Sequence, residues 1–228
     1  MRGKLIVIEG TDCSGKETQS NLLIEVLRKE NIRIEKFSFP NYNSPTGRIV
    51  GGPYLGKRYI CEGWFPEGAP NVDYKVAALY YAADRRYNIE KIEYLLESGV
   101  TVILDRYVYS NMAHQGGKIK SRAERHEVYR WLENLEFGFL ELPRSDINIF
   151  LHMPYEQALI LKQSREEGTD QHEKNPDHLI CAERSYVEIA KYYNFKTIEC
   201  VKDSNIRTVE DIHEELKNYV FSELKKKN

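Results

Sequence analysis

Cysteine is scarce and unpatterned in this sequence of 228 residues. The four cysteines, Cys13, Cys61, Cys181 and Cys200, form no Cys-x-x-Cys pair and have no histidine at the spacing of a metal site. Disulfide-held secreted domains and zinc-binding domains both depend on such patterns. We therefore expect reduced thiols and no zinc site, which indicates a cytoplasmic protein.

Long apolar runs and an excess of charge of one sign are also missing. The first apolar run, Leu5–Ile8, is too short for a signal peptide, and no later run approaches the length of a membrane span. Charged residues make up 30% of the chain, yet the net charge is only -2. This balance disfavours nucleic acid as a partner, and we expect no membrane partner. The length fits a single domain over residues 1–228.

The most informative segment lies near the start of the chain. A β-branched run, Lys4–Glu9, leads into a loop framed by Gly10 and Gly15, and a helical pattern follows. This order is typical of a phosphate-binding loop, in which backbone N–H groups and a helix N-terminus point at one anion while Lys16 adds a full charge. The predicted nucleotide-binding residues are Gly10, Thr11, Asp12, Cys13, Ser14, Gly15, Lys16, Glu17 and Thr18.

The loop departs from the usual motif at one position. Ser or Thr normally follows the lysine and meets Mg²⁺, whereas this chain has Glu17, and Thr18 is one residue out of register. A second acidic group is available, because the buried-type strand that starts at Val100 ends in Asp105. We predict Asp105 as the metal residue and Arg106 as a bidentate phosphate ligand. The alternative for Asp105 and Arg106 is an ion pair at a strand end.

Strand and helix patterns alternate along the rest of the chain. Further strand patterns occur at 32–39, 100–105, 147–152 and 197–201. Helical patterns occur at 73–97, 123–137, 155–165, 177–193 and after Thr208. This alternation predicts an α/β fold in which helices cover both faces of a parallel sheet and the ligand binds at the carboxyl ends of the strands.

Two groups of residues have the chemistry to read a nucleobase. Tyr81 and Arg85 are four positions apart on the helix predicted at 73–97, so a ring and a guanidinium share one face. Taken alone, this pair is more often core packing and a surface charge. Ser110 and Gln115 follow the acidic strand end, where the amide of Gln115 could bond a base edge. The six histidines are scattered and predict no metal site.

A polar segment, Glu166–Pro176, contains no apolar anchor and follows Lys162 and Arg165. One interpretation is a solvated loop. The other is a mobile lid over about residues 163–177, because phosphoryl transfer needs cations that arrive as water leaves.

Taken together, the motifs resemble the thymidylate kinase family over nearly the whole chain. They are Gly10–Gln19, Phe39-Pro40, Tyr81-Ala-Ala-Asp-Arg85, Asp105-Arg106-Tyr107-x-x-Ser110 and Ala113-His-Gln115. The resemblance implies a three-layer P-loop nucleoside monophosphate kinase fold with a five-stranded parallel sheet. It also implies ATP and Mg²⁺ as the donor system, dTMP as the acceptor substrate, and a homodimer.

The resemblance further implies which residues act. The catalytic set is Asp12, Lys16, Arg106 and Arg165, and the loop from Gly10 to Thr18 binds ATP. The substrate-binding set is Asp12, Phe39, Pro40, Arg48, Tyr81, Arg85, Arg106, Ser110 and Gln115. In the implied roles, Tyr81 replaces the family's Phe that stacks on thymine and Arg85 bonds the carbonyl edge.

Two departures from the family pattern shape the expectations. The family often has an Arg two residues after the Phe-Pro proline, where this chain has Tyr42, and Arg48 is the nearest substitute. The cation that bridges donor and acceptor phosphates comes either from the loop residue after the Asp or from the lid. Here the loop residue is Cys13, so we predict Arg165, with Lys162 second. The alternative is that Arg165 only pairs with nearby carboxylates.

Three other functions compete with a dTMP kinase. A kinase for another nucleoside monophosphate would share these motifs. A GTPase-like switch is disfavoured, because the chain has no Asn-Lys-x-Asp guanine reader and no Asp-x-x-Gly after the acidic strand. A non-catalytic P-loop module is suggested only by Glu17.

Overall fold

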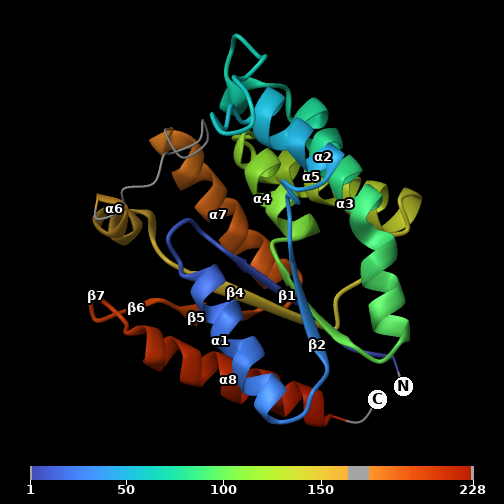
Figure 1. The fold of residues 1–228 in the computed structure, drawn as a ribbon. Helices are drawn as coiled ribbons and strands as arrows, with labels where there is room; N and C mark the ends of the chain where they lie inside the picture. Colours follow the sequence, from blue (N-terminus) through green and yellow to red (C-terminus); the bar gives the residue numbers. More distant parts are fainter. Residues whose placement is uncertain (1, 164–174, 227–228) are drawn as a thin grey trace.

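Five parallel strands form the middle layer of the protein, in the order β2-β3-β1-β4-β5. They are β1 (Leu5–Gly10), β2 (Ile34–Ser38), β3 (Thr101–Asp105), β4 (Ile147–His152) and β5 (Lys196–Glu199). The structure is a computed structural model that describes residues 2–163 and 175–226. The predicted α/β fold with a five-stranded parallel sheet is confirmed (Figure 1).

Helices cover both faces of the sheet (Figure 1). One face carries α1 (Lys16–Lys29) and α8 (Val209–Lys225). The other carries α3 (Tyr74–Glu97), α4 (Val108–Gly117), α5 (Arg122–Glu133) and α7 (Pro176–Tyr192). The shorter elements are α2 (Pro45–Ile49), η1 (Val50–Tyr54), η2 (Ala69–Asn71), η3 (Asn134–Phe139), α6 (Tyr155–Gln163), β6 (Val201–Lys202) and β7 (Asn205–Ile206). No helix in residues 2–163 and 175–226 is long and apolar enough to cross a membrane.

β1 is the central strand and is buried over its whole length. Side chains alternate across a strand, so Leu5 and Val7 join the core beneath α3, α4, α5 and α7. Ile6 and Ile8 point the other way and join the core beneath α1 and α8. Because both faces are covered, the strand is a continuous apolar run, as expected for a parallel sheet.

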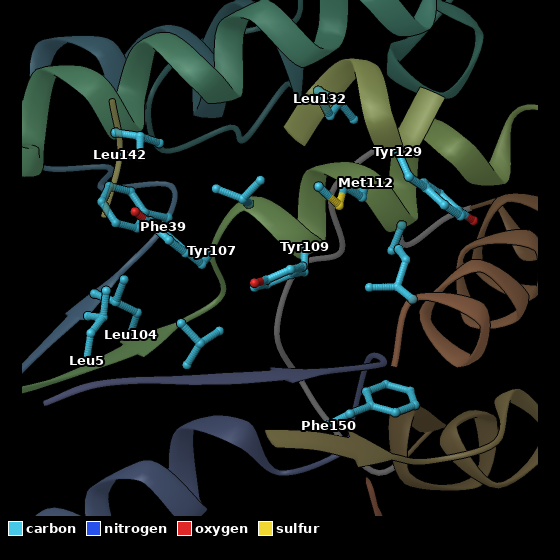
Figure 2. Packing of buried hydrophobic residues seen from close by; sticks show 14 of the residues in the cluster. Leu5, Phe39, Leu104, Tyr107, Tyr109, Met112, Tyr129, Leu132, Leu142 and Phe150 are labelled. Atoms are coloured by element: carbon cyan, nitrogen blue, oxygen red, sulfur yellow. The ribbon is translucent and has the colours of Figure 1, made fainter. Parts of the chain in front are cut away.

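α4 is the main element that the sequence patterns did not predict. Nine of its ten residues are buried, so it has no polar face and no amphipathic period. In Figure 2, Tyr109 and Met112 of α4 lie between Phe150 of the sheet and the α5 residues Tyr129 and Leu132. The helix follows β3 directly and carries the residues from Val108 onward into the core.

α2 likewise does not appear among the helical patterns of the sequence. Ser44 caps its N-terminus by accepting a hydrogen bond from Gly47 N at 3.0 Å, and Pro45 takes the first helical position. An ideal Cβ on Gly47 would lie 1.9 Å from the carbonyl oxygen of Asn41, so only glycine fits where the helix touches the preceding loop.

The topology opens a crevice at the carboxyl edge of the sheet. The neighbouring strands β1 and β3 run in register, with Ile8 opposite Asp105. α1 leaves β1 toward one face of the sheet, and α4 leaves β3 toward the other. Connections that diverge in this way leave a gap above the strand ends, which is where open α/β sheets bind their ligands.

His152, at the end of β4, ties the sheet to two helices. Its Nδ1 lies 2.7 Å from Oε2 of Glu199 on β5, and its Nε2 lies 2.9 Å from Oε1 of Glu183 on α7. The other oxygen of Glu183 accepts a hydrogen bond from Tyr155 N at the start of α6, at 2.9 Å. Burial opposes the charge of the imidazole, but hydrogen bonds and attraction from the two carboxylates outweigh it and raise the pKa of His152.

We predict that His152→Gln removes a pH-dependent part of the stability. Because the pKa of His152 is higher in the folded chain, its contribution is fully present below the unfolded pKa of about 6.5. It is lost as the pH rises through the higher folded pKa. The free energy of unfolding of the wild type should exceed that of the variant by about 1 kcal/mol near pH 6. This difference should shrink toward pH 9. Urea unfolding at several pH values measures this, and a pH-independent difference would contradict it.

Candidate active site

The loop between β1 and α1 has the geometry of a phosphate cradle. Gly15 precedes α1 with φ 76°, in the left-handed region, and no side chain caps the first N–H groups of the helix. Those donors therefore remain available to an anion. An ideal Cβ on Gly10 would lie 2.5 Å from Ser14 Oγ and 2.8 Å from the carbonyl oxygen of Leu151, so the loop closes only around glycine.

Thr11 anchors this loop to the sheet. Its Oγ1 donates to the carbonyl oxygen of Met153 at 2.7 Å and accepts from Met153 N at 3.0 Å, just beyond β4. The loop is thus fixed between the ends of β1 and β4.

Lys16 lies folded back on the loop. Its Nζ donates to the carbonyl oxygens of Gly10 at 3.0 Å and Thr11 at 2.8 Å. Burial, followed by repulsion from Arg106, lowers the pKa of Lys16 to about 8, against attraction from Asp105, Asp12 and Glu9. An anion in the cradle would supply the charge that the buried ammonium lacks.

Arg106 joins the loop to the second motif. Its Nη2 donates to Oδ1 of Asp12 at 3.0 Å, and its Nη1 donates to the hydroxyl of Tyr186 on α7 at 2.9 Å. The backbone of Arg106 has φ 66°, so the chain turns sharply as it leaves β3. A guanidinium held on two sides in this way is oriented for bidentate binding of phosphate.

Glu9 holds the turn that carries Arg106. Its fully buried carboxylate accepts from Tyr107 N at 2.8 Å, Ser110 N at 3.0 Å and Ser110 Oγ at 2.5 Å. Burial raises the pKa of Glu9, although these hydrogen bonds and the nearby Arg106 oppose the rise. Glu9 was not among the residues predicted from the sequence. Its signal was an acidic residue that ends a buried-type strand immediately before the loop.

A pocket of about 570 Å³ adjoins Arg106 and extends between α3, α4 and the chain after β2. It brings together seven predicted residues: Asp12, Phe39, Pro40, Tyr81, Arg85, Arg106 and Ser110. Tyr42, Leu55, Tyr107, Asn111 and His114 complete its wall and were not predicted. Because Asp12 belongs to both the loop and the pocket, the two predicted sites are contiguous.

Asp84 fixes the pocket wall that follows β2. Its buried carboxylate accepts from Asn41 N at 2.8 Å, Ser44 Oγ at 3.0 Å and Thr46 Oγ1 at 2.9 Å. Asp84 lies within the Tyr81 to Arg85 motif, so the same stretch of α3 supplies wall residues and holds the facing loop.

Tyr81 and Arg85 both line the pocket, in different ways. The ring of Tyr81 is half-buried and meets Tyr54 edge-on, with centroids 5.7 Å apart. Arg85 is almost fully buried and forms a bidentate ion pair with Glu136 of η3, through Nε to Oε2 and through Nη2 to Oε1 at 2.6 Å. The ion pair was not predicted, because Glu136 lies 51 residues away within a predicted helix.

Two predicted substrate residues lie away from the pocket. Gln115 is fully buried, neither polar atom of its amide has a partner in the described residues, and it does not line the pocket. Asn111, one helical turn earlier on α4, lines the pocket in its place. Arg48 is exposed on α2 and does not line the pocket either. The geometry supports neither Gln115 as a base reader nor Arg48 as a phosphate ligand.

The remaining predicted residues concern the metal and the lid. Asp105 is half-buried at the end of β3, whereas Glu17 and Thr18 are exposed on the first turn of α1. Arg165 and most of the predicted lid lie outside the described residues, and Lys162 belongs to the last turn of α6. The end of the predicted lid, from Pro176, is the first turn of α7.

Comparison with known proteins decides the family. The family profile described as thymidylate kinase matches residues 8–215. The chain belongs to the thymidylate kinase family. The predicted dTMP-phosphorylating enzyme is thereby confirmed at the level of the family.

Individual thymidylate kinases are similar to this chain over nearly its whole length. A probable thymidylate kinase from Pyrococcus abyssi is 30% identical over an alignment of 229 positions, and the alignment covers 98% of each chain. Human thymidylate kinase is 29% identical over 220 residues, which cover 95% of this chain and 89% of the human one. The structure of thymidylate kinase from Candida albicans superposes with a TM-score of 0.74 at 24% identity, covering 97% of this chain and 92% of that one, which supports the fold.

We predict that ATP binding by this thymidylate kinase family member takes up a proton at alkaline pH. Lys16 has a pKa of about 8 and is largely neutral at pH 9, but the phosphates favour its charged form. ATP affinity should therefore fall as the pH rises through 8. Titration calorimetry in buffers of different ionisation enthalpy should find almost no uptake near pH 6.5 and close to one proton near pH 9. Lys16→Met should lack this uptake, and equal uptake in both proteins would contradict the role.

Proposed function

We propose that this chain transfers the γ-phosphoryl group of ATP to the phosphate of dTMP, with the loop Gly10–Thr18 as donor site and the pocket beside Arg106 as acceptor site. The ion pair between Asp12 and Arg106 carries this proposal, because it stands where the loop and the pocket meet. A phosphate at the mouth of the pocket would lie beside the phosphates held in the cradle.

In this reaction the protein mainly positions the two phosphate groups and neutralises their charge. An oxygen of the dTMP phosphate attacks the γ-phosphorus of ATP, the bond to the β,γ-bridging oxygen breaks, and ADP leaves. In this scheme the cradle and Lys16 hold the donor phosphates. Arg106 neutralises charge between donor and acceptor, while Asp12 and Tyr186 keep its guanidinium in place.

Mg²⁺ is part of the proposal, and the residues present fit it. Asp105 offers a half-buried carboxylate beside the cradle, while Glu9 already accepts three hydrogen bonds from Tyr107 and Ser110. One carboxylate with phosphate oxygens and waters is an ordinary arrangement for Mg²⁺, so Glu17 in place of Ser or Thr does not prevent binding. When bound, the ion would neutralise charge on the donor phosphates.

The pocket wall favours thymine as the base. Arg85 offers guanidinium N–H groups, and Oδ1 of Asn111 is a buried acceptor with no partner in the described residues. A base with a carbonyl next to a ring N–H complements this pair, and Tyr81 offers a ring on which it can stack. Kinases for adenine or cytosine nucleotides need a different pattern of donors and acceptors.

The alternative of a non-catalytic P-loop module rested on Glu17. Glu17 is exposed and Lys16 lies on the loop, so nothing in the described residues favours that alternative.

We also propose a homodimer in the cytoplasm. α3 carries a stripe of exposed apolar side chains that support an interface with a second copy: Val76, Leu79, Tyr87 and Tyr94. Within the described residues the cysteines form no disulfide, which suits a reducing compartment.

The proposed function is tested with Lys16→Met in a coupled assay with ATP, Mg²⁺ and dTMP. The variant should lose transfer by about a thousandfold or more, while dTMP binding measured by calorimetry stays close to wild type, because the ammonium serves the donor phosphates. A wild-type protein that does not form dTDP would refute the function. A loss of dTMP affinity as large as the loss of rate would refute the assignment of the cradle to ATP.

The lid prediction is tested with Arg165→Ala. Cys13 cannot supply the bridging cation from the loop, and a cation that acts only in the closed transition state is worth about 10³ in rate. We expect kcat to fall at least about a hundredfold while the affinities for ATP and dTMP change little. Lys162→Ala is the comparison, with a smaller expected effect. A fall of less than about fivefold for Arg165→Ala would place the cation elsewhere.

A further inference from the structure

Glu136 is fully buried and accepts hydrogen bonds from both residues that face the base in the proposed function. Its Oε2 accepts from Arg85 Nε, and its Oε1 accepts from Arg85 Nη2 at 2.6 Å and from Asn111 Nδ2 at 2.9 Å. We propose that Glu136 is a positioning residue that sets the donor and acceptor pattern of the base pocket and thereby selects thymine over cytosine. This inference rests on the proposed function.

The partners of Asn111 fix which way its amide points. Nδ2 donates to the carbonyl oxygen of Ala78 at 3.1 Å and to Glu136. Both partners are acceptors only, so the NH₂ group must face them and Oδ1 must face away. Oδ1 is buried and has no partner in the described residues, although Asn111 lines the pocket. Asn111 therefore keeps one unused acceptor at the pocket wall, and the proposal assigns this acceptor to the base.

Arg85 presents the complementary donor. Glu136 occupies its Nε and Nη2, so Nη1 is the guanidinium nitrogen that the ion pair does not use. Burial opposes the charge of Arg85, but Glu136 outweighs it and raises the pKa, so the side chain remains a cation. Because one carboxylate holds both Arg85 and Asn111, the donor and the acceptor are fixed relative to each other.

This pair distinguishes the two pyrimidine edges. Thymine offers a carbonyl to Arg85 and the N3–H group to Oδ1 of Asn111. Cytosine offers an amine to the guanidinium and a ring nitrogen with a lone pair to Oδ1, which leaves two repulsive contacts in a buried site. Uracil has the same edge as thymine and is not distinguished by this device.

The position of Glu136 agrees with a role in the site. It lies on the π-helix η3, an element that is frequent at functional sites, and η3 turns Glu136 inward while Phe139 remains 84% exposed. A buried ion pair is weak evidence for stability, because desolvation cancels much of the attraction. A role in specificity accounts for the cost of burying this one.

The test compares Glu136→Gln with a matched control. A Gln side chain has one acceptor and one donor end, so it cannot accept from Arg85 Nε, Arg85 Nη2 and Asn111 Nδ2 together. The control is Glu188→Gln. Glu188 accepts hydrogen bonds from Arg125 Nε at 3.0 Å and Arg125 Nη2 at 2.6 Å, so this ion pair is also bidentate, but Glu188 does not line the pocket. kcat/KM is measured for dTMP, dUMP and dCMP in each protein.

For Glu136→Gln we expect the ratio of kcat/KM for dTMP to that for dCMP to fall by about tenfold or more, with the ratio for dTMP to dUMP unchanged. Glu188→Gln should keep both ratios within about twofold of wild type. A purely structural role would lower kcat/KM for all three substrates in proportion. An unchanged ratio of kcat/KM for dTMP to that for dCMP in Glu136→Gln therefore overturns the inference.

If Glu136→Gln does not fold, Glu136→Asp answers the same question, because a carboxylate shorter by one methylene keeps the charge but cannot span Arg85 and Asn111. The same tenfold criterion applies to it. Failure of the proposed function is distinct, since the wild type would then not phosphorylate dTMP at all.

Discussion

The buried carboxylate of Glu9 connects the two strand ends on which the site is built. It belongs to β1, directly before the cradle, and it accepts hydrogen bonds from the backbone that follows β3. An ionised or even a neutral carboxyl group is costly to bury without partners, so this position is stable only when the turn after β3 supplies them. The register of β1 against β3 therefore determines where Arg106 stands relative to the loop.

A chain of polar contacts extends from this carboxylate across the site. Ser110 lies 2.8 Å from the hydroxyl of Tyr186, which in turn accepts from Arg106, and Arg106 donates to Asp12 of the cradle. The ring of Tyr186 stacks on Phe150 of the sheet, with centroids 5.5 Å apart. The guanidinium of Arg106 is thus held by residues from three distant parts of the chain. Its orientation therefore depends on the whole fold.

The parts of the site that could be predicted are those set by local geometry. A phosphate cradle needs glycines and a lysine at fixed spacing, and the spacing of Tyr81 and Arg85 puts them on one helical face, so both were visible in the sequence. Gln115 and Asn111 are one helical turn apart on α4 and chemically alike. Only the packing of α4 against its neighbours decides which of them reaches the pocket, and no local pattern contains that information.

Other parts depended on long-range contacts. The sequence of α4 shows no helical period of apolar residues, because the helix is buried on all sides and lacks the polar face that marks a surface helix. Glu136 is separated from Arg85 by 51 residues, and the π-helix that turns it inward has no signature in the sequence. The fold class was predictable because alternation of strands and helices constrains it strongly. The partners of buried charges were not, because they follow from the finished packing.

The contact of Arg106 with Tyr186 has a thermodynamic consequence. α7 carries Tyr186, which contacts Arg106, and also Glu183, which accepts a hydrogen bond from the first residue of α6. A movement of α7 would therefore change the contact with Arg106 and the contact with α6 together. If one substrate moved α7, it would change the affinity for the other, and linkage requires that the change be the same in both directions.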